Sequence, residues 1–326
     1  MKNNYKIFII ISLLLILILG MIYYLSNTDG ENSDSSATTE LNILVSFYPL
    51  YEFTSNIAKD KANVSTIIPI GVEPHHFEIT PSKLLEMQNA DIIIKMGFES
   101  WDDNQIKELN SDVIIINIIE VLEKQNPELL ISTLDDEHGD EHGDEHDHNI
   151  DFDPHVWLDP ILVKSISIII QDSIINMDEK NTEYYTENTN LYLNKLDELD
   201  NEIKSTLKEC QNDKLVTFHE AFGYFAKQYG LQYTSLSGFA PDSEISGNKI
   251  KKIIEFMKDN NIKVIYSEEL VDSRFSETIA NEIDGEILLL SPLERLTEEE
   301  LNQKVTYFDK MMQNLINLEI GLECKL

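Results

Sequence analysis

The histidines are the residues in this chain whose type and spacing are best suited to chemistry. The sequence contains eight, at four places: His75 and His76, a group between 138 and 148, His155, and His219. A neutral imidazole nitrogen is a good ligand for Zn²⁺, which accepts four nitrogen or oxygen ligands at about 2.0–2.1 Å. Because a lone histidine is more often a surface or hydrogen-bonded core residue, the interpretation depends on where each one lies.

Three of these places lie in loops or turns that could present a side chain to a ligand. His75, in GVEPHHFEITPS, follows the apolar run 64–70, and His219 follows the run 214–218 and begins HEAFGYFAKQ. His155 lies in DPHVWLDP, a turn bounded by two prolines. Loops at the carboxyl ends of parallel strands are where ligands bind in α/β proteins. We therefore predict that these three histidines converge on one metal ion.

A second group of histidines occupies a segment of unusual composition. Residues 136–149, DEHGDEHGDEHDHN, contain no apolar residue and repeat a tetrapeptide. Such a segment cannot bury anything, so we expect a surface loop. Imidazoles interleaved with carboxylates favour borderline cations, which suggests a weak metal-collecting role, and the alternative is an inert solvated insert. Its histidines are His138, His142, His146 and His148.

The elements that must position the histidines follow an alternating pattern. Within 41–180, short apolar runs rich in β-branched residues alternate with helical stretches, and a second such series occupies 210–326. This alternation predicts parallel sheets covered by helices. Between the two series, 181–209 carries apolar residues at spacings of three, four or seven, typical of one long amphipathic helix. The expected fold class is α/β, with two lobes, this connecting helix and the metal site in the cleft between the lobes.

The first forty residues differ from the rest of the chain. Residues 7–25 are uncharged, almost wholly apolar and long enough to cross a bilayer, and Lys2 and Lys6 precede them. We expect residues 1–25 to be an uncleaved membrane anchor, with a cleaved signal peptide as the alternative, and the rest of the chain to lie outside the cytoplasm. The polar segment 26–40 is expected to be a flexible tether.

Charge and cysteine content narrow the possible partners. The chain has 59 acidic against 25 basic residues and a formal charge of −34, which argues against nucleic acid as a partner. The same charge suits a protein that gathers cations or a protein from a saline habitat, and composition does not separate the two. Cys210 and Cys324 are the two cysteines, and the extracytoplasmic compartment permits either a disulfide or two free thiols.

Several motifs occur in an order that resembles a known family over residues 41–320. They are ILVSFYPLYEFTSNIA, GVEPHHFEITPS, NADIIIKMGFESW, the histidine-rich segment, DPHVWLDP, TFHEAFGYFA, SLSGFAPDSEIS, KVIYSEEL and LLLSPL. The succession resembles the zinc branch (ZnuA-like) of the metal-binding solute-binding proteins that serve ABC transporters.

The resemblance implies two lobes joined by one rigid helix, with little closing motion and metal held by His75, His155 and His219. It also implies an ABC permease and ATPase as partners, no enzymatic activity and a monomeric state. Manganese-selective relatives usually carry Glu at the position of His219, so the histidine here favours Zn²⁺ over Mn²⁺.

One departure from the family pattern concerns the fourth ligand. Many relatives have Asp in an LDPL segment after the last strand, where this chain has Ser291-Pro292-Leu293. We expect water to be the fourth ligand, with Glu268 and Glu220 as the next candidates. His76 is a poorer candidate, because adjacent side chains in a loop seldom reach the same ion.

Three other functions fit parts of the sequence. A zinc hydrolase could use three histidines and a water, with Glu220 as general base, but the HExxH motif is absent. A metal-binding adhesin or a stationary surface buffer could use the same fold, and a manganese importer could use a similar site.

Overall fold

In this computed structural model the chain divides into residues 1–40 and residues 41–326. The described residues from 41 onward form the folded unit. The expected anchor and tether, 7–25 and 26–40, lie almost entirely outside the described residues, as does the histidine-rich segment. The structure describes residues 17–21, which are helical, and residues 40–99, 101, 103–133, 152–241, 243, 245–269 and 271–325.

The first lobe contains a parallel sheet in the order β2-β1-β3-β4. Its central strand β3 reads IIIK and is buried along its whole length, which explains the run of β-branched side chains. The strands are β1 (Leu41–Val45), β2 (Ala62–Thr66), β3 (Ile92–Lys95) and β4 (Ile114–Asn117). The helices are α2 (Tyr48–Ala58), α3 (Pro81–Gln88), α4 (Asp103–Leu109) and α5 (Ile118–Gln125), with short 3₁₀ turns at η1 (Lys59–Lys61) and η2 (Pro127–Leu129).

The second lobe repeats the same strand order, β6-β5-β7-β8, again parallel throughout. Its strands are β5 (Lys214–Thr217), β6 (Gln232–Ser235), β7 (Val264–Ser267) and β8 (Glu286–Leu289). Its helices are α8 (Gly223–Tyr229), α9 (Gly247–Asp259) and α10 (Arg274–Ile283). In both sheets the chain order reverses next to the first strand, and such a reversal opens a crevice at the carboxyl ends of the strands.

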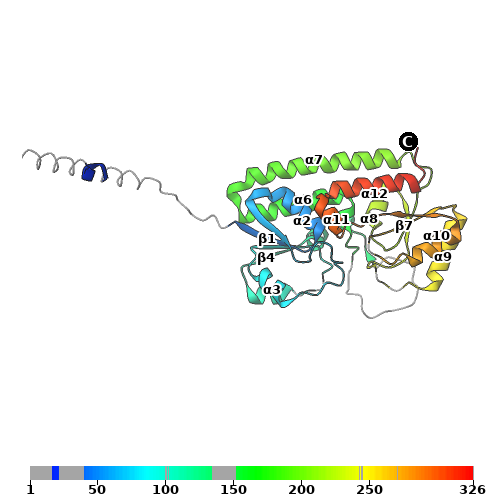
Figure 1. Ribbon diagram of the computed structural model, residues 1–326, viewed down its shortest axis with the longest axis horizontal. Coiled ribbons are helices and arrows are strands. Elements are labelled where there is room, and N and C mark those ends of the chain that lie inside the picture. The colour runs from blue at the N-terminus through cyan, green and yellow to red at the C-terminus, as the bar shows by residue number, and fades with distance from the viewer. Residues whose placement is uncertain are drawn as a thin grey trace, which may run out of the picture. The chain divides into compact units, whose positions relative to one another are not determined.

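A long helix, α7, connects the lobes. It runs from Thr182 to Leu207 without glycine or proline and buries one stripe that includes Tyr185, Leu196 and Ile203. Its 26 residues correspond to roughly 39 Å at 1.5 Å per residue. In Figure 1, α7 extends alongside both lobes, with α12 (Tyr307–Gly321) beneath it. The predicted fold class, two α/β lobes with parallel sheets joined by one long helix, is confirmed.

One long helix and three short helical elements remain among the described residues. They are α6 (Pro160–Met177), the short α11 (Glu298–Gln303), and the 3₁₀ turns η4 (Val156–Leu158) and η5 (Glu179–Asn181). Among the described residues, α6 has the length and hydropathy of a membrane span. However, it packs against α7 and α2 and contributes buried side chains such as Val163, Ile166 and Ile170 to the core. It is therefore a core helix of the folded unit.

The two cysteines form a disulfide bond. Cys210 lies just beyond the end of α7, and Cys324 just beyond the end of α12. The bond therefore ties together the ends of two helices that lie side by side, and it settles a pairing that the sequence left open.

Candidate metal site

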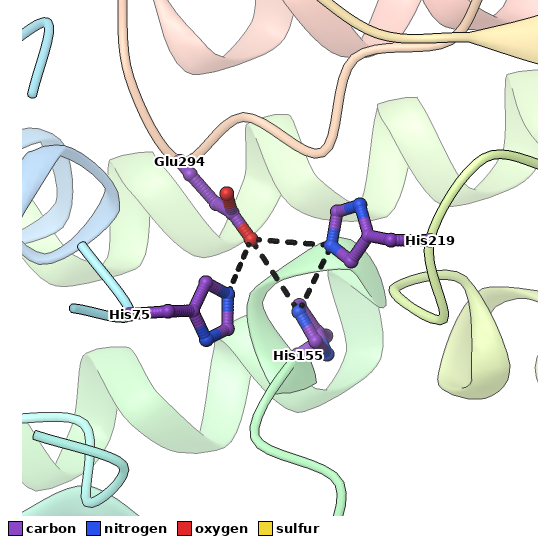
Figure 2. A group of neighbouring side chains, drawn as sticks. All are labelled: His75, His155, His219 and Glu294. Atoms are coloured by element: carbon purple, nitrogen blue, oxygen red, sulfur yellow. Dashed lines mark hydrogen bonds and ion pairs between the residues drawn. The ribbon is translucent and has the colours of Figure 1, made fainter. Parts of the chain in front are cut away.

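Four side chains from distant parts of the sequence meet at one point between the lobes. They are His75, His155, His219 and Glu294, and one ligand atom from each lies within 4.8 Å of those from the others. Figure 2 shows the three imidazole rings directed at the carboxylate of Glu294. The structure therefore brings together the three histidines that the sequence singled out, and it adds a carboxylate that the sequence analysis did not identify.

The site is built from loops that leave the carboxyl ends of strands. His75 lies in the loop after β2, His219 follows β5 and Glu294 follows β8. His155 is the residue before η4, in the segment that leads into α6. Because parallel strands deliver their exit loops to the same edge of a sheet, residues far apart in sequence reach one place.

Four of the six distances among these groups are close to those in a tetrahedral zinc site. Ligands at about 2.0–2.1 Å from Zn²⁺ in tetrahedral geometry lie about 3.3 Å from one another. Oε1 of Glu294 lies 3.0 Å from Nε2 of His75 and 3.4 Å from Nε2 of both His155 and His219. The Nε2 atoms of His155 and His219 are also 3.4 Å apart. All four ligand atoms lie within 4.8 Å of one another, close enough to share one ion.

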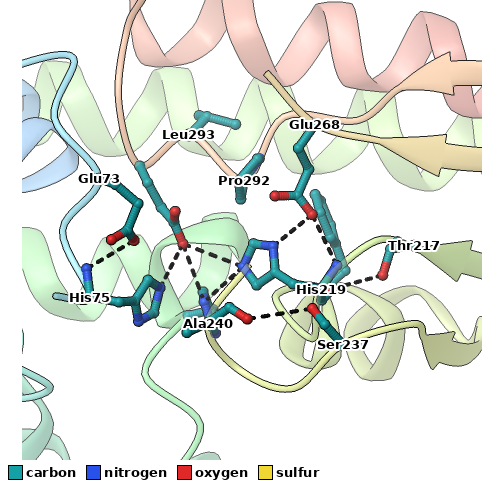
Figure 3. A network of polar contacts seen from close by, with 12 residues as sticks. Glu73, His75, Thr217, His219, Ser237, Ala240, Glu268, Pro292 and Leu293 are labelled. Atoms are coloured by element: carbon teal, nitrogen blue, oxygen red, sulfur yellow. Dashed lines mark hydrogen bonds and ion pairs between the residues drawn. The ribbon is translucent and has the colours of Figure 1, made fainter. Parts of the chain in front are cut away.

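Carboxylates hold two of the rings through their other nitrogen. Nδ1 of His155 lies 2.7 Å from Oδ1 of Asp153, and Nδ1 of His219 lies 2.6 Å from Oε1 of Glu268. Each carboxylate also accepts a hydrogen bond from the backbone N–H of the same histidine. Figure 3 shows the Glu268 contact and the bond from the His75 N–H to Glu73. Such partners fix the orientation of a ring and leave Nε2 free to face a metal ion.

Glu268 therefore occupies a different position from the one expected for it. The sequence analysis named it as a candidate fourth ligand, but it is not one of the four converging groups and instead contacts the far side of the His219 ring. Glu220 and the exposed His76, the other candidates, are also not among the four. The fourth of the converging groups is the carboxylate of Glu294, whereas the expectation from the sequence was a water ligand.

The path of the chain after β8 explains why Glu294 was missed. Ser291 does replace the aspartate of the family pattern, so the sequence predicted the loss of a carboxylate. The structure compensates three residues later, because Leu293 adopts a left-handed conformation with φ of 58° and the turn brings Glu294 back to the site. Sequence spacing alone gives no sign of such a turn at a leucine.

Burial and charge make the site strongly polarised. Burial acts to lower the pKa of His219, but the neighbouring carboxylates Glu268 and Glu294 outweigh it and raise the pKa to about 10. For His155, burial is likewise outweighed, chiefly by Asp153, and the pKa is raised. The pKa of Glu294 lies well below its usual value, because the three histidines outweigh the cost of burial. In the metal-free site the protonated forms of His155 and His219 are therefore favoured by the carboxylates that face them.

Aromatic side chains surround the histidines. The ring of Phe98 lies 5.1 Å from that of His75, and the rings of Trp157 and Phe239 lie 5.0 and 6.3 Å from that of His155. The side chains of His155 and His219 are fully buried, and those of His75 and Glu294 are 5% and 4% exposed. An ion held here would be largely shielded from bulk water, which strengthens its interaction with Glu294.

A buried three-histidine, one-carboxylate site between two parallel α/β lobes linked by one helix defines the class of metal-binding solute-binding proteins. Residues 43–321 match the model of the family described as zinc-uptake complex component A, periplasmic. This chain belongs to that family, as the motif order suggested. The family consists of zinc-binding transport components and not of enzymes, so the zinc-hydrolase alternative is set aside.

Individual relatives support the same assignment. The "High-affinity zinc uptake system protein ZnuA" of Bacillus subtilis is 36% identical over 302 residues, which cover 92% of this chain and 93% of that protein. The "Zinc-binding protein AdcA" of Streptococcus pyogenes is 33% identical over 297 residues. The crystal structure of Zn(II)-bound AdcA from Streptococcus pneumoniae has a TM-score of 0.71 at 31% identity and matches 88% of this chain. The chain covers 56% and 58% of these two AdcA chains, little more than half.

Proposed function

We propose that this chain captures Zn²⁺ outside the cytoplasm and delivers it to the permease of an ABC-type importer. In this proposal His75, His155, His219 and Glu294 hold the ion. The observation that carries it is the convergence of three Nε2 atoms on one carboxylate oxygen at 3.0 to 3.4 Å. The names of the relatives, which refer to zinc uptake and zinc binding, agree with this cargo.

The ligand set favours zinc over manganese. Three imidazoles and one carboxylate suit a borderline cation, whereas Mn²⁺ is better served by a site rich in oxygen ligands. Zn²⁺, three neutral histidines and the Glu294 carboxylate together carry a net charge of +1. Asp153 and Glu268, which contact the far sides of the His155 and His219 rings, offset this charge. In competition experiments we expect zinc to displace manganese completely at equal concentrations.

The surrounding parts of the chain have supporting roles in this proposal. The lobes are residues 41–180 and 210–326, joined by the helix predicted at 181–209. Residues 136–149 raise the local metal concentration, and contact with the permease distorts the site between the lobes and releases the ion. Residues 7–25 anchor a monomer to the outer face of the cell membrane, with a cleaved signal peptide as the alternative.

Titration of two ligand variants tests the site. Glu294→Gln and His219→Ala should each weaken zinc binding at least tenfold, measured by competition with a chromogenic chelator. His76→Ala is the matched control, because it removes an exposed histidine next to a proposed ligand and should leave the affinity unchanged. Wild-type affinity in Glu294→Gln would remove that residue from the ligand set.

Two further experiments address the loop and the transport role. Deleting 136–149 should leave one tight site, seen as a stoichiometry of one in calorimetry, and loss of all binding would reverse the assigned roles. A stationary zinc buffer would bind the metal equally well. Deleting the gene of such a buffer would leave cellular uptake of radioactive zinc unchanged. Deleting the gene of an import component should instead reduce uptake at low external zinc.

A further inference from the structure

Helix α12 carries two buried polar side chains that reach the loops of the metal site. Lys310 and Asn314 lie one turn apart on the same face of the helix, and each is 4% exposed. Burying an amide and an ammonium group is costly unless their hydrogen-bonding capacity is used. Their partners therefore indicate what this face of the helix does.

Asn314 holds the turn that delivers Glu294. Its Oδ1 accepts a hydrogen bond of 2.8 Å from the Ser291 N–H, and its Nδ2 donates one of 2.7 Å to the Ser291 carbonyl. Two bonds to one residue fix both the position and the direction of the chain as it leaves β8. The Ser291 hydroxyl then accepts a bond of 3.2 Å from the N–H of Leu293, the residue with left-handed φ. A leucine stays in that conformation only when its surroundings enforce it.

Lys310 holds the neighbouring loop, which delivers Glu268. Its Nζ forms ion pairs with Glu269 and, at 2.7 Å, with Glu300. Glu269 follows the residue whose carboxylate contacts Nδ1 of His219. The carbonyl of Glu269 also accepts a bond of 2.9 Å from the guanidinium of Arg295, the residue after Glu294. One face of α12 therefore contacts both the loop that carries Glu294 and the loop that carries Glu268.

We propose that Lys310 and Asn314 are positioning residues that set how long the site retains zinc, Asn314 through Glu294 and Lys310 through Glu268 and His219. The proposal rests on the ligand role proposed above for Glu294. Both residues lie on α12, which packs against the connecting helix α7. The packing of these two helices therefore helps to set the positions of the loops that carry Glu294 and Glu268.

The rate of zinc loss tests this role directly. We expect Asn314→Ala to speed zinc dissociation into excess chelator about 10- to 100-fold, the range typical when a partner behind a ligand is removed. Asn317→Ala is the matched control. Asn317 lies on the same helix and donates a bond of 2.6 Å to the carbonyl of Leu289, the last residue of β8 and before the turn. Its removal should leave the dissociation rate within about twofold of wild type, since it does not act on the turn.

A double-mutant cycle separates positioning from general destabilisation. In the Glu294→Gln background, Asn314→Ala should add no further acceleration, because it acts through the carboxylate already removed. Lys310→Met should still accelerate dissociation in the Glu294→Gln background, because Lys310 acts through the loop that carries Glu268. Equal effects of Asn314→Ala in both backgrounds would overturn the proposal and indicate a purely structural role. If Asn314→Ala does not fold, Asn314→Asp keeps the acceptor for the Ser291 N–H and serves in the same cycle.

The two proposals fail in different ways. Glu294→Gln with wild-type zinc binding contradicts the ligand assignment itself. Glu294→Gln that loses zinc rapidly, together with Asn314→Ala that retains it as wild type does, contradicts only the positioning role.

Discussion

The indole Nε1 of Trp157 donates a hydrogen bond of 2.7 Å to the carbonyl oxygen of Pro292. This bond links the segment that carries His155 to the turn that carries Glu294, two parts of the chain far apart in sequence. Trp157 is fully buried, and its ring also packs against Phe47 at a centroid distance of 4.8 Å. The tryptophan therefore joins two sides of the site and fills the core beneath them.

Replacing this indole should weaken both stability and zinc binding. Trp157→Phe keeps an aromatic ring but leaves the buried Pro292 carbonyl without its donor, which should cost about 1–3 kcal/mol of unfolding free energy. Trp101→Phe is the control, because the Trp101 Nε1 is buried without a hydrogen-bond partner among the described residues. Denaturant unfolding should show a clearly smaller loss for Trp101→Phe, and equal losses would mean that the Pro292 bond contributes nothing.

Zinc binding should release protons, and affinity should rise with pH. In the metal-free protein His219 has a pKa of about 10, raised by Glu268 and Glu294 against the effect of burial, so it carries a proton at pH 7.5. Zinc requires the neutral ring and must displace that proton. Calorimetry in buffers of different ionisation enthalpy should therefore give at least one proton released at pH 7.5. An affinity that stays constant between pH 7 and 9 would contradict the argument.

The raised pKa of His219 should make the metal-free protein less stable as pH rises. A histidine whose folded pKa lies above its unfolded value of about 6.5 contributes stability that is complete below that value. The contribution disappears as pH rises through the folded pKa, here about 10. The thermal midpoint of the metal-free protein should thus fall between pH 7 and 10, and Glu268→Gln should flatten this decline.

Breaking the disulfide should destabilise the fold without removing the metal site. The Cys210–Cys324 bond spans a sequence separation of 114 residues, for which the chain-entropy model predicts roughly 4–5 kcal/mol. Cys210→Ser with Cys324→Ser should lose about that much unfolding free energy while retaining zinc affinity within about threefold. The reduced wild-type protein is the control and should match the double variant; a large loss of affinity in either would show that the bond shapes the site.

The cap of α6 offers a test of a buried carboxylate. Asp159 accepts a hydrogen bond of 2.8 Å from the Ile161 N–H, yet burial raises its pKa to about 6. Because the ionised form is disfavoured in the fold, its penalty is absent below about pH 3.8 and complete above about pH 6. Asn also caps helices well, so Asp159→Asn should stabilise the protein by up to roughly 2–3 kcal/mol at pH 8. The gain should shrink near pH 5, and a gain independent of pH would point to another cause.

The sequence was sufficient for the parts of the site that local pattern determines. His219 could be placed because an apolar β-branched run directly precedes it, and His75 could be placed because it lies in the loop that follows the apolar run 64–70. The alternation of runs and helices likewise gave both lobes, and the apolar spacing of Tyr185, Leu196 and Ile203 gave α7, within two residues of its observed ends.

What the sequence could not give depends on contacts between distant residues. Glu294 reaches the site through a turn at Leu293 that Asn314 and Trp157 enforce, and no local pattern encodes those partners. Glu268, a candidate fourth ligand from the sequence, directly follows the end of β7 and contacts Nδ1 of His219 instead of joining the four converging groups. The pairing of Cys210 with Cys324 similarly depends on α12 returning alongside α7.

The connecting helix α7 has no glycine or proline along its 26 residues, so it offers no point at which to bend. The two lobes therefore do not close on an ion by bending this helix. The four converging groups already lie within 4.8 Å of one another without an ion. Cations are then selected by how well their radius and coordination preference suit that arrangement.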